Sequence, residues 1–250
     1  MSRIALGIMC KAPVEGECKT RLCPPLLPHE AAALSRSFIA DVARVVAEVA
    51  SRTSATGIAI HTPVPERALE GLLPEGFATL EQRGTNLGER LLNVSRDLFG
   101  AGFTGICLIN ADSPTIPASL LEMAVTHLRK PGDRFVIGPA IDGGYYLIGL
   151  KHPHAQVFEG VSWGGSRVLA ETLGRMAGIP IPVTLLPLWY DVDELCTLQL
   201  LIHELFGRGV PLHGGALAAS PAPRTRSVIR ALLQAEDAVR FGITLDLSEK

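Results

Sequence analysis

The sequence predicts an α/β fold built on a mostly parallel central sheet. Short β-rich runs alternate along the chain with segments whose apolar residues recur at spacings of three and four. That alternation is typical of parallel strands joined by crossover helices. The 250 residues are 47% hydrophobic and 19% charged, a composition that is typical of globular proteins and excludes intrinsic disorder. A chain of this length forms one large domain or two small ones.

Seven β-rich runs account for the expected strands. The first is an apolar heptad that Lys11 ends, and no small-residue cleavage pattern follows it. We therefore interpret this heptad as a strand and not as the core of a signal peptide. The expected strands cover residues 4–10, 57–61, 78–82, 105–110, 135–138, 145–149 and 183–186.

Helices are expected between these strands. Residues 29–50 place most of their apolar side chains close to one helical face. The helix that begins near residue 87 has Asn86 as its candidate N-cap, with Glu89 three positions further on. Another helix follows Pro117 and ends before Pro131. Two more are expected at about 166–177 and 194–206.

The composition changes after residue 206. Residues 207–223 are rich in Gly, Ala and Pro, as linkers and long loops are. An amphipathic helix is expected at about 225–241. We therefore expect one domain over residues 1–206, followed by a linker and C-terminal helix over 207–250 that packs on this domain or extends from it.

Charge and hydropathy exclude two classes of partner. The chain has 23 Lys and Arg against 25 Asp and Glu, without a long run of one sign. Nucleic acids and membrane surfaces both require clustered cations, so we expect neither as a partner. No apolar run reaches the roughly 18 residues of a membrane-spanning helix, and we expect a soluble, cytoplasmic protein. The five cysteines never form a CxxC pair, which argues against a zinc site or a disulfide framework.

The loop after the first expected strand carries three cations. Lys11, Lys19 and Arg21 lie within eleven positions of one another, around Gly16. Loops at the carboxyl ends of parallel strands form the ligand crevice of open α/β sheets, and Lys and Arg suit a diphosphate. The loop is not a Walker A motif, because it lacks a Gly-Lys-Thr tripeptide. An ordinary basic surface loop is the alternative.

Two acidic segments also follow expected strands. Asp112 comes directly after residues 105–110, and Asp191-Val192-Asp193 follows residues 183–186. Magnesium commonly takes one or two carboxylates together with substrate phosphates, so Asp112 and Asp193 are candidate metal ligands. The alternative for Asp112 is a turn or a helix cap, and for Asp193 a helix N-cap.

Two glycine-containing turns complete the set of motifs. Asp142-Gly143-Gly144 joins two expected strands, and Asp142 could accept hydrogen bonds from ligand hydroxyl groups. A plain hairpin turn is the alternative. Gly84 and Thr85 form a turn that enters a helix, where simple turn and cap chemistry is the alternative.

Together these motifs resemble one family. The order KAPxxGxxKTRL, GTNLGERL, ADSPTIP, GPAIDGGYYLIGL, Trp163 and DVD resembles bacterial nucleotide-diphospho-sugar transferases, some of them described as arsenosugar-biosynthesis glycosyltransferases. The chain is more remotely similar to the guanylyltransferases that make molybdenum cofactor derivatives and activate phospholactate. The resemblance covers about residues 3–206 and implies a GT-A fold, a single Rossmann-like α/β/α domain.

The resemblance also implies roles for individual residues. The matching positions place Lys11, Gly16, Lys19 and Arg21 around the nucleotide phosphates, Gly84 and Thr85 near the base, and Asp112 and Asp193 on the metal. Three positions depart from the family pattern: Glu15 replaces a usual Pro, Asn110-Ala111 a usual Gly-Thr, and Gly164-Gly165 a usual Ser-Thr after Trp163. The last change is expected on the acceptor side of the site.

The function expected from these residues is a metal-dependent glycosyl transfer from a nucleoside diphosphate sugar to a small-molecule acceptor. Asp112 and Asp193 would hold Mg²⁺ or Mn²⁺, and Lys19 with Arg21 would assist the leaving diphosphate. Asp142 would orient the acceptor or act as its base. Two alternatives remain open. One is a guanylyltransferase-like nucleotidyltransferase that releases pyrophosphate, and the other is a nucleotide-binding module without turnover.

Overall fold

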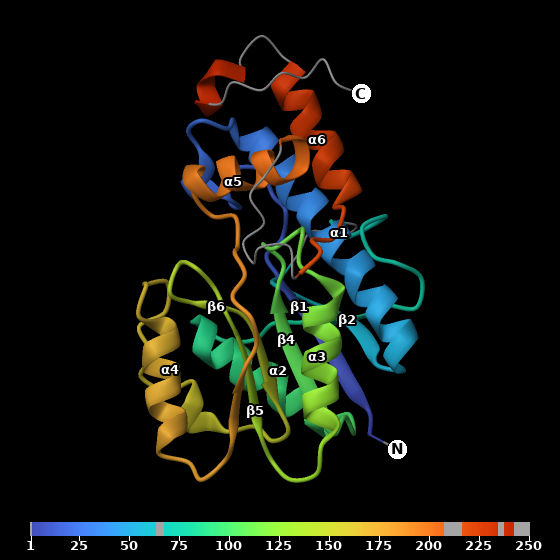
Figure 1. Ribbon diagram of the computed structural model, residues 1–250, viewed down its shortest axis with the longest axis vertical. Coiled ribbons are helices and arrows are strands. Elements are labelled where there is room, and N and C mark those ends of the chain that lie inside the picture. Colours follow the sequence, from blue (N-terminus) through green and yellow to red (C-terminus); the bar gives the residue numbers. More distant parts are fainter. Residues whose placement is uncertain (1, 64–67, 208–216, 235–237, 243–250) are drawn as a thin grey trace.

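The computed structural model describes residues 2–63, 68–207, 217–234 and 238–242 (Figure 1). Its seven strands each agree within one residue with the runs expected from the sequence. They are β1 (Ile4–Cys10), β2 (Thr56–His61), β3 (Ala78–Glu81), β4 (Gly105–Asn110), β5 (Phe135–Pro139), β6 (Tyr145–Leu150) and β7 (Val183–Leu185). Across the described ranges the main helices are α1 (Pro28–Thr53), α2 (Leu87–Gly100), α3 (Ala118–Arg129), α4 (Val168–Ala177), α5 (Leu195–Phe206) and α6 (Pro223–Gln234).

The strands form one mixed sheet in the order β3-β2-β1-β4-β6-β5-β7. Every neighbouring pair is parallel except the two that involve β6, which runs antiparallel to both β4 and β5. The reason lies in the Asp142-Gly143-Gly144 turn, because so short a connection reverses the chain and cannot cross over the sheet. The expected α/β class with a mostly parallel sheet is confirmed, and so is the hairpin at this turn.

Helices cover both faces of the sheet. One core cluster joins α1 and α3 to one face and continues into α5 and α6, and a second joins α2 and α4 to the other face. In Figure 1, α5 and α6 lie with the first turns of α1 at the upper end of the molecule, beyond the sheet. None of the helices in the described ranges has both the length and the apolar character that a membrane crossing requires.

The C-terminal helix α6 packs along α1. Asp41 of α1 is 1% exposed, and its carboxylate accepts hydrogen bonds from the backbone N–H groups of Arg224 (3.2 Å) and Thr225 (2.7 Å). This carboxylate satisfies free N–H groups in the first turn of α6 and favours a helix start at Pro223.

The end of the chain differs from the expected single helix at about 225–241. The described part of helix α6 covers Pro223–Gln234, and Ala238–Phe241 form a 3-10 turn and not an α-helix. In that turn Arg240 donates to the Pro25 carbonyl and to the Glu30 carboxylate, contacts that hold the turn against the start of α1. Most of the expected linker, residues 208–216, lies outside the described residues, as do residues 235–237.

Candidate functional site

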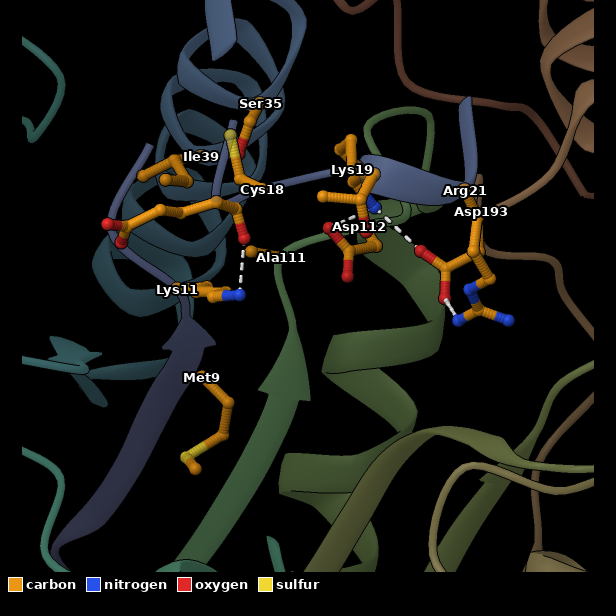
Figure 2. Close-up of a pocket in the computed structure, with 12 residues that line it drawn as sticks. Met9, Lys11, Cys18, Lys19, Arg21, Ser35, Ile39, Ala111, Asp112 and Asp193 are labelled. Atoms are coloured by element: carbon orange, nitrogen blue, oxygen red, sulfur yellow. Dashed lines mark hydrogen bonds and ion pairs between the residues drawn. The ribbon is translucent and has the colours of Figure 1, made fainter. Parts of the chain in front are cut away.

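The candidate site lies where β1 and β4 end side by side. The two strands are parallel with Met9 opposite Asn110, so the loops that begin at Lys11 and Ala111 leave the same edge of the sheet. Figure 2 shows both strands pointing into a pocket that the two loops line together with the 193 segment and helix α1. The lining residues are Met9, Lys11, Glu17, Cys18, Lys19, Thr20, Arg21, Ser35, Ile39, Ala111, Asp112 and Asp193.

Lys19 lies at the centre of this pocket. Its backbone is left-handed, with φ 50 and ψ 35, and its side chain is 5% exposed. The ammonium contacts Asp112 Oδ1 at 2.5 Å, Asp193 Oδ1 at 2.8 Å and the Val192 carbonyl oxygen at 2.8 Å. Burial alone would lower the pKa of Lys19, but the attraction of the two carboxylates raises it above its usual value. Lys19 is therefore a fixed positive charge between two acidic segments.

Arg21 lies at the open side of the same cluster, in the short 3-10 turn Thr20–Leu22. Its guanidinium donates to Asp193 Oδ2 at 2.6 Å and approaches Glu194 Oε1 at 3.5 Å. Asp193 thus binds Lys19 with one oxygen and Arg21 with the other, as Figure 2 shows. Because the Arg21 side chain is 60% exposed, its guanidinium can contact an anion that enters the pocket.

The two candidate metal ligands, Asp112 and Asp193, both contact the Lys19 ammonium. Neither is the helix cap that the alternative interpretations proposed, because the N-caps of α3 and α5 are Pro117 and Glu194. Burial raises the pKa of the Asp112 carboxyl, and Lys19 offsets this only in part. Burial also acts to raise the pKa of Asp193, but Lys19 and Arg21 outweigh it and lower that pKa.

The two carboxylates fit a divalent cation that takes its remaining ligands from a substrate. Within the described ranges, no group of three or more His, Cys, Asp or Glu side chains is arranged to hold a metal ion. Two carboxylates on one cluster still match Mg²⁺, which takes one or two carboxylates and completes its shell with phosphate oxygens and water. The site suits a cation that arrives with a phosphate ligand better than one held by the protein alone.

A second pocket adjoins the first and shares Arg21 and Asp193 with it. Its lining residues are Arg21, Ile141, Asp142, Gly164, Gly165, Ser166, Asp191, Asp193, Glu194, Cys196 and Thr197. Asp142 lies here, and its Oδ1 accepts the Gly144 N–H at 2.8 Å. Burial, together with the charges of Asp142, Asp193 and Asp112, raises the pKa of Asp191 to about 7.

Asp191 and Glu194 line the second pocket, whereas the sequence interpretation assigned a role only to Asp193 in this segment. The Asp-Val-Asp pattern of residues 191–193 was the available signal, since side chains at alternate positions of an extended segment point to the same face. The contribution of Ser35 and Ile39 from α1 had no such signal. Ser35 is polar and Ile39 apolar, and the helical periodicity of residues 29–50 predicts only that this face of the helix is buried.

Three predicted nucleotide-binding residues lie outside the lining of the first pocket. Gly16 is exposed in the loop, with φ +76, and the Lys11 ammonium closes that loop by donating to the Glu17 carbonyl oxygen. The Gly84-Thr85 turn belongs to the start of α2, where Glu89 Oε2 accepts from both the N–H and the hydroxyl of Thr85 at 2.8 Å. Turn and cap chemistry is therefore present there, and contact with a base stays a prediction.

Comparison with known proteins agrees with this architecture. Residues 45–165 match the model of a family described as an uncharacterized protein conserved in bacteria (DUF2064). A search of curated proteins finds no significant match. The crystal structure of a candidate nucleotide-diphospho-sugar transferase from Desulfovibrio desulfuricans G20 is similar at 27% sequence identity and a TM-score of 0.78, covering 98% of this chain and 100% of that chain.

A more distant structure shows the same fold. It is a CMP:2-keto-3-deoxy-manno-octonic acid synthetase complexed with CTP, similar at 14% identity and a TM-score of 0.50, with 82% of this chain and 100% of that chain covered. The chain therefore shares its fold with a candidate nucleotide-sugar transferase and with a synthetase that binds CTP.

Proposed function

We propose that this chain is a metal-dependent glycosyltransferase that uses a nucleoside diphosphate sugar. The observation that carries the proposal is the convergence of Lys11, Lys19 and Arg21 with Asp112 and Asp193 in one pocket at the strand ends. Cations suit the two phosphates of the donor, and carboxylates suit a cation that those phosphates bring. The similar candidate nucleotide-diphospho-sugar transferase supports this choice of donor.

In this proposal the pocket residues act on the leaving group. Lys19 and Arg21 bind the donor diphosphate, with Lys11 and the loop around Gly16 beside it. Asp112 and Asp193 hold Mg²⁺ or Mn²⁺, which when bound neutralises charge that develops on the leaving diphosphate. The Gly84-Thr85 turn faces the base, as the resemblance of the sequence implies.

The adjoining pocket takes the acceptor. An acceptor hydroxyl attacks the anomeric carbon, the bond from that carbon to the diphosphate oxygen breaks, and Asp142 orients the hydroxyl or accepts its proton. Asp142, Asp191 and Glu194 line this pocket, and the one Lys or Arg among its described lining residues, Arg21, is assigned in this proposal to the donor diphosphate. That charge favours a hydroxyl-bearing acceptor without a phosphate, which supports glycosyl transfer over transfer to a substrate phosphate.

The test is a screen of nucleotides and nucleotide sugars for thermal stabilisation, with Mn²⁺ and with EDTA. A ligand at 100 times its dissociation constant adds about 2.7 kcal/mol of stability. We expect a nucleoside diphosphate and one nucleotide sugar to stabilise the protein in the presence of the metal. Asp112→Asn should lose the metal-dependent part. Asp97→Asn should keep it, because the Asp97 carboxylate lies on α2 and pairs with Arg83.

Product analysis then separates the alternatives. A glycosyltransferase releases the nucleoside diphosphate from the stabilising sugar donor. Release of pyrophosphate from a nucleoside triphosphate would instead identify a nucleotidyltransferase. Metal-dependent binding without any product over the donor panel would identify a binding module without turnover.

A further inference from the structure

Asp112 and Asp193 come from two irregular segments that no strand pairing holds together. Asp112 lies in residues 110–115, after β4, and Asp193 lies in residues 188–194, between β7 and α5. The backbone joins the segments through the hydrogen bond from the Val192 N–H to the Asp112 carbonyl oxygen, 2.9 Å long. Besides Lys19, which contacts both carboxylates, side chains at this junction therefore contribute to the spacing of the two carboxylates.

Buried hydroxyl groups supply those contacts. Ser113, Thr115 and Tyr190 are all 0% exposed. The Ser113 hydroxyl lies 2.8 Å from the Tyr190 carbonyl oxygen and 3.0 Å from Asn110 Oδ1. It connects the residue next to Asp112 directly with the chain that leads to Asp193. Water cannot replace these partners at a buried site, so each lost contact leaves a polar group unsatisfied.

The Tyr190 side chain anchors the junction to helix α5. Its hydroxyl donates to Glu204 Oε2 at 2.5 Å, and Thr115 Oγ1 lies 3.1 Å from the same hydroxyl. Because the tyrosine hydroxyl has one hydrogen, which Glu204 accepts, Thr115 is the donor of the second bond. The network runs from α5 through Tyr190 to both sides of Ser113 and reaches neither the Lys19 ammonium nor the open pocket.

We propose that Ser113 and Tyr190 are positioning residues whose buried hydrogen bonds hold Asp112 and Asp193 at the spacing that metal–diphosphate binding requires. The inference rests on the proposed function in one respect, namely that this pocket binds a metal with a diphosphate. Groups that orient metal ligands from behind commonly change metal affinity by 10–100-fold when they are removed.

The experiment measures binding of magnesium pyrophosphate by calorimetry, beside the melting temperature of each variant. The main variant is Tyr190→Phe, which keeps the ring and removes both bonds of the hydroxyl. The matched control is Tyr146→Phe. Tyr146 is also 0% exposed, and its hydroxyl donates to the Pro187 carbonyl oxygen at 2.9 Å, whereas the Tyr190 hydroxyl bonds Thr115 and Glu204. Both variants therefore lose a buried tyrosine hydroxyl that holds the chain between β7 and α5.

We expect similar losses of melting temperature in both variants, but a dissociation constant raised at least tenfold in Tyr190→Phe and less than threefold in Tyr146→Phe. Ser113→Ala is a smaller change that should also raise the dissociation constant. It provides the test if Tyr190→Phe does not fold. A purely structural role would lower the melting temperature and leave the dissociation constant of the folded protein unchanged.

The outcomes separate the two proposals. Wild-type binding that Tyr190→Phe and Ser113→Ala both retain would overturn the positioning role and leave the proposed function intact. Equal weakening in Tyr190→Phe and Tyr146→Phe would also overturn it, because the effect would not be specific to this junction. Absence of magnesium pyrophosphate binding by the wild-type protein would overturn the proposed function and the inference together.

Discussion

The ammonium of Lys19 lies 2.5 Å from Asp112 Oδ1 with only 5% of the lysine side chain exposed. The same ammonium contacts Asp193 at 2.8 Å. One buried cation thus holds together two carboxylates that would otherwise repel each other, and removal of one partner from such a cluster strands the remaining charges.

The first prediction follows from that arrangement. Lys19→Met keeps most of the side-chain length and removes the charge. We expect a loss of about 3 kcal/mol in the free energy of unfolding, at the low end of the range for a buried pair because 37% of the Asp112 side chain is exposed. Urea unfolding at pH 7 measures it. Lys11→Met, at an exposed position of the same loop, should cost less than about 1 kcal/mol, and equal losses would contradict the central role of Lys19.

The second prediction concerns the binding of phosphate by Arg21. Charge-assisted hydrogen bonds contribute about 1.5 to 3 kcal/mol, so Arg21→Ala should weaken nucleoside diphosphate binding about tenfold or more. Arg21→Lys should restore part of this, because a point charge replaces a bidentate fork. Calorimetry with the diphosphate and with the free nucleoside provides the comparison. If the variant lost affinity equally for both, Arg21 would act on the base or on the fold.

The third prediction tests the packing at the start of α2. A Cβ atom at Gly88 would lie 2.6 Å from Trp163 Nε1 and 2.8 Å from the Phe158 carbonyl oxygen. Gly88→Ala should therefore cost about 1 to 3 kcal/mol through overpacking. Gly174 lies inside α4 with nothing within 4 Å of its Cβ position, so Gly174→Ala should stabilise by about 0.5 to 1 kcal/mol. Thermal unfolding distinguishes the opposite signs.

The fourth prediction is a pH dependence of stability that arises at Glu30, which is not among the residues that line the pocket. Burial alone would raise the pKa of Glu30, but Arg240 and the Leu27 N–H outweigh it and lower that pKa. A lowered pKa in the folded state adds stability above the unfolded pKa of about 4.3, and this stability is lost as the pH falls through the folded value.

Glu30→Gln should therefore reduce the free energy of unfolding by about 1 to 2 kcal/mol at pH 7. The difference from wild type should shrink as the pH falls below about 4. Urea unfolding across this range measures it, with Glu48→Gln as the control because Glu48 forms exposed ion pairs within α1. A difference that did not change with pH would show that the ionised form of Glu30 is not what stabilises the fold.

Local patterns were enough to predict the elements and part of the site. The strands are short apolar runs bounded by turn residues, and the first helices carry apolar stripes, so each follows from its own neighbours in sequence. The loop cations and Asp112 could be placed at strand ends for the same reason. Parallel strands end at a common edge, and Lys11 and Asp112 both line the pocket at that edge.

The sequence by itself thus determined the α/β class, the order of elements and which loops carry charge. Tertiary structure alone decided that β6 lies between β4 and β5 in the sheet. It also decided that Lys19 and Arg21 both contact Asp193 and that Asp191 lines the second pocket. The Gly84-Thr85 turn lies outside the lining of the first pocket. Those relations join segments far apart in the chain, and their geometry is set by packing and by buried hydrogen bonds such as that of Ser113 with Tyr190. Local periodicity contains no information about such contacts, because it depends only on the few residues on either side.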